Sequence, residues 1–358
     1  MASYEGQTGA PVIMKHTEEE TKLIRAAANL TRELSVASPA IFWGDLLLNM
    51  TLGYGALFLV LTATTPWILA LSWLVSILAL YRVGSFIHEL THLKKTAVPG
   101  FRTFWNLFAG VPLMIPSFMY EGTHNQHHAR TRYGTKNDPE YLPLALMSVG
   151  KLILFMVASL LGPIGLLIRY AIFSPLSLIF PPFRKVVVAR FSTLAINPDY
   201  RRKMPTGEFR KDWIWMETAT SLFAIGLLVL VFTGYIPMIS YLTFLAVISV
   251  TMFLNQIRTL VAHLWENDGE PINVTEQYLD SVNVPPPGLL PALWAPVGLR
   301  FHALHHLIPS VPYHALGEAH RRLAAEMPES NAYHRANYPG LPGLVIRLVK
   351  NAARSKPA

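Results

Sequence analysis

The chain has 358 residues, of which 52% are hydrophobic and only 15% charged, and its mean hydropathy is +0.33. A soluble domain carries about 25% charged residues, so this composition indicates an integral membrane protein. The sequence contains no cysteine, which excludes disulfides, iron–sulfur clusters and zinc sites with thiolate ligands. The formal net charge is +8, but the basic residues lie between apolar segments, as is usual beside membrane spans, so no nucleic-acid partner is needed to explain the charge.

The N-terminal segment, residues 1–38, is polar and is expected to lie in the cytosol. It contains apolar residues at helical spacing, which predict an amphipathic helix: Leu23, Ile24, Ala27, Leu30 and Leu34. The apolar stripe of this helix has two natural partners. It could rest on the membrane surface, or it could pack against the cytosolic part of the same protein.

Four apolar stretches are each near the 20 residues that cross a bilayer core: about 41–62, 66–86, 218–233 and 237–256. Short uncharged links join them in pairs, which predicts two helical hairpins. Basic residues follow the second stretch, so we expect that end and both chain termini to face the cytoplasm. The fold expected is an all-α membrane protein with four transmembrane helices, capped by a cytosolic helical domain.

Two further apolar segments do not fit this pattern of simple crossings. Residues 101–120 are broken by Gly110, Pro112 and Pro116, and residues 144–183 contain Gly162-Pro163 and Arg169. Histidine clusters that must share one side of the membrane come before and after the first segment, so we expect it to be re-entrant or interfacial. The second is expected to be a bent interfacial pair or a returning hairpin. The predicted membrane domain spans 39–325, followed by a cytosolic tail over 326–358.

Eight of the thirteen histidines gather in three short boxes near the predicted span ends. The second and third boxes share the spacing H-x-x-H-H, which places all three rings on one face of a helix. The predicted topology brings the three boxes to one side of the membrane. The box residues are His88 and His92; His124, His127 and His128; and His302, His305 and His306.

Such clusters are typical of metal sites, because neutral imidazole is the commonest metal ligand in proteins. One octahedral ion takes about six ligands, so eight imidazoles suit two metals better than one. Nitrogen donors fit iron, copper, zinc or nickel, and the residues alone do not choose among them. The isolated histidines His16, His320 and His334 are assigned ordinary structural or surface roles.

Two other functional classes account for parts of this pattern. The run His88-Glu89-Leu90-Thr91-His92 matches the H-E-x-x-H signature of zinc metalloproteases, including intramembrane ones, but leaves both H-x-x-H-H boxes unexplained. A metal transporter or sensor would place ionisable residues near the middle of the bilayer, whereas these histidines lie beyond the span ends.

The order and spacing of the boxes resemble the membrane fatty acid desaturase/hydroxylase superfamily, whose signature is H-x(3,4)-H, H-x(2,3)-H-H and [HQ]-x(2,3)-H-H. The resemblance covers roughly residues 40–325, and the run 309–314 also looks like bacterial members. It implies a four-span bundle with a cytosolic cap that holds two iron ions. It also implies dioxygen activation and removal of two hydrogens from a fatty acyl chain.

The resemblance adds candidate residues to the site. Related desaturases supply a further iron ligand from the segment after the last span, where this chain has His263. Glu89, Asp138 and Glu266 are candidate acceptors that would orient the ligand rings. His314 is expected to be structural, and no catalytic residue beyond the ligands is predicted.

The expected function is therefore a di-iron, dioxygen-dependent fatty acyl desaturase. Hydroxylation or ketolation of a lipid, an alkane or a carotenoid is the nearest alternative, because the same boxes serve both outcomes. The chain has no haem motif and no nucleotide fingerprint, so the electrons must come from a separate donor of the ferredoxin, rubredoxin or cytochrome b5 type. Box one is H-x(3)-H rather than the H-x(4)-H of animal acyl-CoA desaturases, which argues against that form of substrate.

Overall fold

The structure is a computed structural model that describes residues 18–354, and over that range it is helical apart from isolated β-bridges. Five helical segments are long and apolar enough to cross a membrane. They are α2 (Pro39–Thr62), α3 (Pro66–His92), the composite segment Val149–Ile179, α10 (Gly207–Phe232) and α11 (Met238–Leu260). The predicted class, an all-α multi-pass membrane protein, is confirmed.

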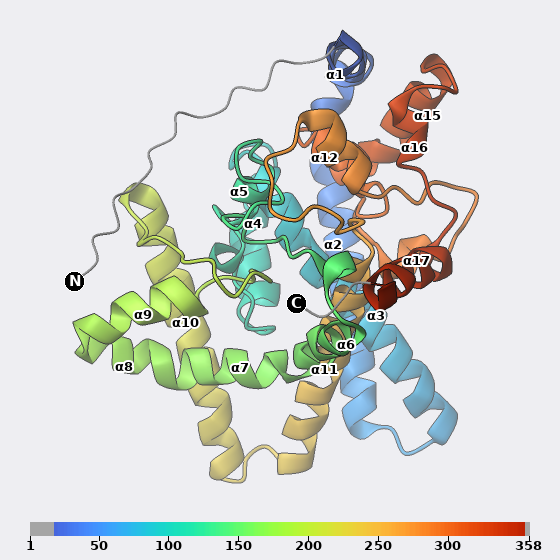
Figure 1. Ribbon diagram of the computed structural model, residues 1–358. Helices are drawn as coiled ribbons and strands as arrows, with labels where there is room; N and C mark the ends of the chain where they lie inside the picture. The colour runs from blue at the N-terminus through green and yellow to red at the C-terminus, as the bar shows by residue number, and fades with distance from the viewer. Residues whose placement is uncertain (1–17, 355–358) are drawn as a thin grey trace, which may run out of the picture.

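The four predicted spans form two hairpins, α2–α3 and α10–α11, which extend downward from the rest of the molecule in Figure 1. Proline occupies the first turn of α2 and α3, where its missing N–H costs nothing. Two boundaries differ from the prediction. Helix α3 continues past residue 86 to His92, which makes the first box part of the helix, and α10 begins at Gly207 instead of residue 218.

Close packing holds the α2–α3 hairpin together. A Cβ atom at Gly53 would lie 2.8 Å from Cδ2 of Leu80, so only glycine permits this approach of the two helices. Ser76 on α3 donates a hydrogen bond of 3.2 Å to the carbonyl of Gly53. Val247 of α11 joins Leu80 in the same buried cluster, which ties the second hairpin to the first.

The segment 101–120 is broken, as predicted, and is not among the five long apolar helices. It consists of α4 (Phe101–Trp105), a π-turn (Asn106–Gly110) and a 3₁₀ turn (Ser117–Met119). The indole N–H of Trp105 donates to the carbonyl of Val83 at 2.8 Å. This segment therefore packs against α3 just before the first histidine box.

Within the segment 144–183, the composite helix Val149–Ile179 has 17% of its most apolar window inside the protein, which is as low as the value for α11. It contains α6 (Val149–Ala158), α7 (Gly162–Ile168) and α8 (Ser174–Ile179), joined by 3₁₀ and π-turns, and leads into α9 (Pro181–Phe191). Figure 1 shows α7 and α8 running across the direction of both hairpins. Its composition permits a crossing, so the count of four spans is not confirmed. Its crosswise course supports the interfacial placement, which stays a prediction.

Helix α1 (Glu18–Thr31) packs on α15 (Leu316–Glu326). Leu23 and Ala27 are fully buried in a cluster that α15 shares, and the carbonyl of Leu30 accepts a hydrogen bond of 3.0 Å from Arg322. Two partners were expected for this apolar stripe, the membrane surface and the rest of the protein. In the structure the stripe packs against α15, so it is not available to the membrane surface.

The remaining elements build the body that carries the histidines. The stretch predicted as a tail contributes to this body, since Leu344, Leu348 and Ala352 of its last helix are buried. The elements are 3₁₀ turns at Arg32–Ser35, Leu144–Leu146 and Tyr313–Ala315, and helices α5 (His124–His127), α12 (Val274–Asp280), α13 (Pro291–Trp294), α14 (His302–Leu307), α16 (Ala332–Arg335) and α17 (Leu341–Arg354).

Candidate metal centre

Four separate parts of the chain deliver imidazole rings to one region. The first box ends α3, the second forms α5 and its C-terminal cap, and the third begins α14. His263 follows α11 and pairs with Ser281 in an isolated β-bridge. Helical spacing of three and four residues keeps the rings of each box on one side of its helix. All nine predicted ligands therefore meet near the C-terminal ends of α3 and α11.

The nine rings form two groups, and within each group one nitrogen of every ring lies within 4.8 Å of the others. The five-histidine set is His88, His92, His124, His128 and His305. The four-histidine set is His127, His263, His302 and His306. The second and third boxes each contribute to both sets, so neither box corresponds to one metal.

Within the sets, Nε2 atoms face one another at hydrogen-bond distance. His128 and His124 are 2.9 Å apart, His127 and His263 3.2 Å, and His302 and His263 3.0 Å. Ring nitrogens about 2.1 Å from one ion lie at most about 4.2 Å from one another. Each set is already near that size, so its donors fit a single metal ion.

The protonation of these rings also suits metal binding. Burial lowers the pKa of His128, His302, His305 and His306 well below the usual histidine value. These four rings are therefore neutral at physiological pH, and each offers a lone pair. Seven buried and two half-buried imidazoles, with no thiolate, make a nitrogen-rich donor set of the kind that iron accepts.

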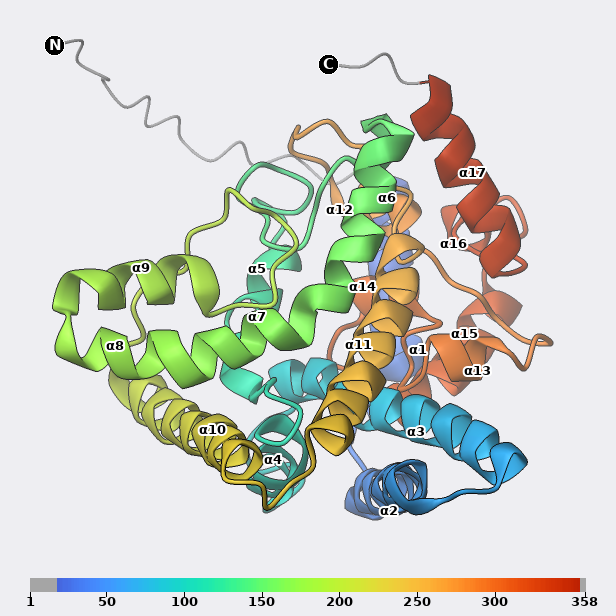
Figure 2. The same cartoon turned by 90° about the horizontal axis from the view of Figure 1, so that it is seen from below.

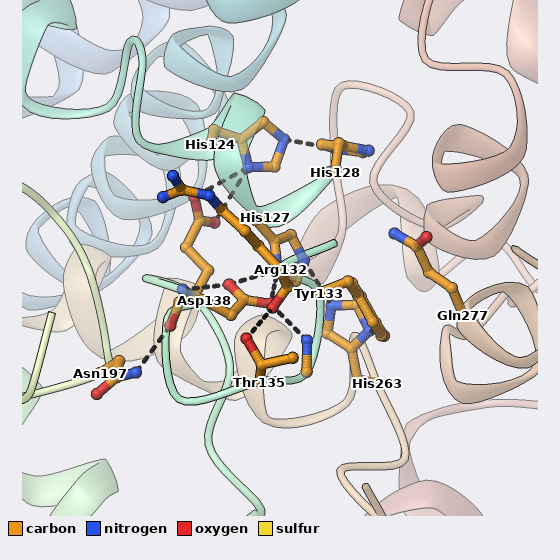
Figure 3. Close-up of polar contacts among 12 residues, drawn as sticks. His124, His127, His128, Arg132, Tyr133, Thr135, Asp138, Asn197, His263 and Gln277 are labelled. Atoms are coloured by element: carbon orange, nitrogen blue, oxygen red, sulfur yellow. Dashed lines mark hydrogen bonds and ion pairs between the residues drawn. The ribbon is translucent and has the colours of Figure 1, made fainter. Parts of the chain in front are cut away.

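Carboxylates contact Nδ1 of two rings of the second box, on the side away from Nε2 (Figure 3). Both oxygens of Asp138 lie 2.9–3.0 Å from Nδ1 of His127, and Asp138 is itself fixed by the backbone N–H of Gly134 at 2.8 Å. Glu140 lies 3.0 Å from Nδ1 of His124. These contacts leave Nε2 of each ring free to face the metal position.

Neutral groups support two rings of the four-histidine set. Tyr133 and Ser281 lie 2.8 and 3.1 Å from Nδ1 of His263, and the hydroxyl of Tyr133 donates to Asp280 at 2.7 Å. Gln277 lies 3.0 Å from Nδ1 of His306. Asp138 was predicted from the sequence, whereas Glu140 and these neutral groups were not. The acidic pair Asp138 and Glu140, which begins ten residues after the second box, was the one local signal for Glu140.

The other two predicted acceptors have different roles. Glu266 was predicted to orient a ligand ring, and the structure does not support this. Its carboxylate points toward α17 and pairs with Arg347 at 2.9 Å. Glu89 accepts a hydrogen bond of 3.0 Å from the backbone N–H of Tyr313 and approaches Nδ1 of His88 only to 3.5 Å. A carboxylate held in this way does not match the free base that the metalloprotease reading of this box requires.

The histidines outside the boxes have ordinary partners, as expected. His314 accepts a hydrogen bond from the backbone of Ser38 at 3.1 Å. His320 contacts the hydroxyl of Tyr333 at 2.8 Å, and His334 contacts the carbonyl of Met327 at 3.0 Å. His16 lies outside the described residues.

A cavity of about 570 Å³ reaches both histidine sets. It is lined by His88 of the five-histidine set and by three members of the other, and its far walls are mostly apolar side chains of α3, α7 and α11. These helices lie next to one another, with α11 between α3 and α7 (Figure 2). The apolar residues that line the cavity include Leu80, Leu113, Leu166, Ile248 and Met252. A lipid chain can therefore lie in the cavity with one carbon beside the ligand rings.

Comparison with known proteins agrees with this geometry. Residues 64–338 match the fatty acid desaturase family. The chain is also 47% identical to a ceramide hydroxylase from Caulobacter vibrioides (strain NA1000 / CB15N), over 96% of this chain and 100% of the relative. On these matches, this chain, an oxidoreductase with a histidine-rich centre in a membrane, belongs to the fatty acid desaturase family.

Proposed function

We propose that this protein is a di-iron, dioxygen-dependent hydroxylase of ceramide or a closely similar amide-linked lipid. The observation that carries the proposal is the apolar cavity that reaches both histidine sets. The likeness to a ceramide hydroxylase favours hydroxylation over the desaturation expected first from the sequence. Hydroxylation, the nearest alternative to desaturation in the sequence analysis above, is thus the better supported reaction.

In the proposed reaction a C–H bond of the lipid becomes C–OH. One dioxygen, two electrons and two protons are consumed, and the second oxygen atom leaves as water. Two irons held by the nine histidines would supply the reduction of dioxygen and the oxidising power that an unactivated C–H bond requires. A separate protein of the ferredoxin, rubredoxin or cytochrome b5 type would supply the electrons. The boxes and both termini would face the cytoplasm.

The chain's own residues position the ligand rings and the lipid, and they exclude water from the reacting carbon. Asp138 and Glu140 fix the orientation of two ligand rings through Nδ1. The apolar walls keep water from the reacting carbon and hold the chain in one direction. Leu166 of α7 and Met252 of α11 contribute to these walls opposite α3. Holding the C–H bond in place is the main lever that such a site has over which carbon reacts.

The test is reconstitution of the purified protein with ceramide, dioxygen and a reduced donor protein. We expect about two irons per chain and a product heavier than the substrate by one oxygen atom, taken from labelled dioxygen. A product that has instead lost two hydrogens would restore the desaturase assignment. Zinc as the sole metal, together with peptide cleavage, would support the protease.

The cavity itself can be tested at Gly84, which lines it one helical turn before His88. A Cβ atom at this position meets only Ile115, at 3.6 Å, so a larger side chain extends into the cavity. We expect Gly84→Phe to keep its iron and to lose at least about tenfold in kcat/KM, because the lipid chain is displaced. Gly55→Phe on the exposed side of α2 is the matched control, since nothing lies within 4 Å of its Cβ position. Equal activity of the two variants would contradict the assignment of the cavity.

A further inference from the structure

Two arginines with buried guanidinium nitrogens line the same cavity, and their surroundings differ. Arg169 on the α7 side is well provided with acceptors. Its Nη2 pairs with Glu217 at 2.6 Å and donates to Ser192 at 2.8 Å, and its Nε donates to the carbonyl of Phe191 at 2.8 Å. This arginine joins α7 to α10, and with a further bond from Nη1 to Ser174 four of its five N–H donors are already used.

Arg258 of α11 has no such provision. Its Nε is buried without a hydrogen-bond partner, and its Nη2 donates to Oδ1 of Asn255 at 3.3 Å. Its charge acts on the carboxylate of Glu140, which lines the same cavity, but among the described residues no carboxylate forms an ion pair with it. An oxygen acceptor at hydrogen-bond distance would stabilise such a partly buried cation.

The position of Arg258 near the histidines increases its need for an oxygen acceptor. Arg258 lines the same cavity as His127, His263 and His302, which are three of the four rings of the four-histidine set. When metal cations occupy the sets, Arg258 becomes a third positive charge there, and an oxygen with lone pairs is the partner that relieves it.

Along α11 the lining of the cavity changes in one direction. Ile248 and Met252 form the apolar part, Asn255 and Arg258 follow, and His263 comes just after the helix end. Arg258 lies two residues before the end of α11, and His263 lies three residues after it. The amide and charged side chains of this wall are thus at the end of α11 that leads to the ligands.

We propose that Arg258, supported by Asn255, binds a carbonyl or hydroxyl oxygen of the lipid and so sets which carbon reaches the ligand rings. This inference rests on the proposed function and adds to it a rule for the position of reaction. The oxidised carbon lies within a few bonds of the bound oxygen, and the hydrocarbon chain extends away along α11 toward Ile248. A substrate without such an oxygen loses this anchor.

The experiment measures binding of ceramide and of a plain n-alkane of equal chain length to the iron-loaded protein without dioxygen. We expect Arg258→Gln to keep its iron, to bind ceramide roughly 10–100-fold more weakly, as loss of a charged hydrogen bond implies, and to bind the alkane unchanged. Its product is expected to carry hydroxyl groups at several carbons. Arg210→Gln, which removes an exposed arginine outside the cavity, is the control.

Unchanged preference of Arg258→Gln for ceramide over the alkane would overturn the inference. If this variant does not fold or loses iron, Arg258→Lys is measured in its place. Lysine keeps the charge but not the planar fork, so a reduced preference supports the inference and a wild-type preference overturns it. A wild-type protein that binds ceramide through Arg258 but forms no hydroxylated product would refute the proposed function alone.

Discussion

The four-histidine set and the five-histidine set differ in how firmly their rings are held. In the four-histidine set, three rings have a hydrogen-bond partner on Nδ1: His127, His263 and His306. In the five-histidine set, His124 has Glu140, whereas Nδ1 of His88, His128 and His305 is buried without a partner; in the four-histidine set this holds for His302 alone. The rings of the four-histidine set are oriented mainly by neighbouring side chains. In the five-histidine set, metal binding depends more on the number of ligands.

This difference implies that the two positions need not bind metal with equal affinity. A ring whose remote nitrogen is fixed loses less freedom on binding and is a better donor. A ring without such a partner must be oriented by the metal itself. We therefore expect the four-histidine set to bind its iron more tightly, even though it has one ligand fewer.

Removal of one ligand from each set should have the largest effect. His305→Ala and His306→Ala are neighbours on α14 and are matched in size. Both are expected to abolish hydroxylation, because the reaction needs both metals. Iron analysis should find about one iron left in His305→Ala, held by the intact four-histidine set, and less than that in His306→Ala. Equal iron in the two variants would refute the proposed difference in strength.

Asp138→Asn should have the next largest effect. The carboxylate contacts Nδ1 of His127 at 2.9 Å, and an amide there cannot stabilise the ring to the same extent. Loss of such a partner typically costs 10–100-fold in metal affinity or activity, and we expect a loss of this size in titrations with ferrous iron. Glu266→Gln is the matched control, because its carboxylate pairs with Arg347, and it should retain wild-type affinity.

Gln277→Leu should have the smallest effect of the three. It removes a neutral hydrogen bond of 3.0 Å to His306 and keeps the volume of the side chain. A neutral hydrogen bond contributes about 1 kcal/mol, so iron affinity should fall about fivefold. An effect as large as that of Asp138→Asn would mean that charge on the partner does not matter in this set.

Local sequence predicted more of this site than of its surroundings. The boxes could be assigned because their spacing is fixed within single helices, whereas His263 was predicted from the family resemblance and its place after the last span. The division of the second and third boxes between two sets could not be predicted, since it depends on how α5 and α14 are rotated against α3. Tyr133 and Asp280 come together only through folding, so no motif contains them both.

The same limit applies to the fold. Two hairpins followed from the lengths of apolar runs, but the covering of α1 by α15 joins segments almost 300 residues apart. The pairing of Arg169 with Glu217 likewise explains how a charge is accommodated in an apolar segment, and neither residue alone revealed it. Periodicity shows which face of a helix is apolar and does not show what covers that face.

The ligands of the four-histidine set extend from residue 127 to residue 306 of the chain. During synthesis the two hairpins can enter the membrane before α14 exists, so neither metal position is complete until the ribosome has passed the third box. If the two sets hold iron as proposed, its entry would be a late step of biogenesis that joins segments made at different times. Metal that binds only the finished arrangement stabilises it by mass action. In cells short of iron, the inserted protein should consequently be less stable and be degraded faster by proteases.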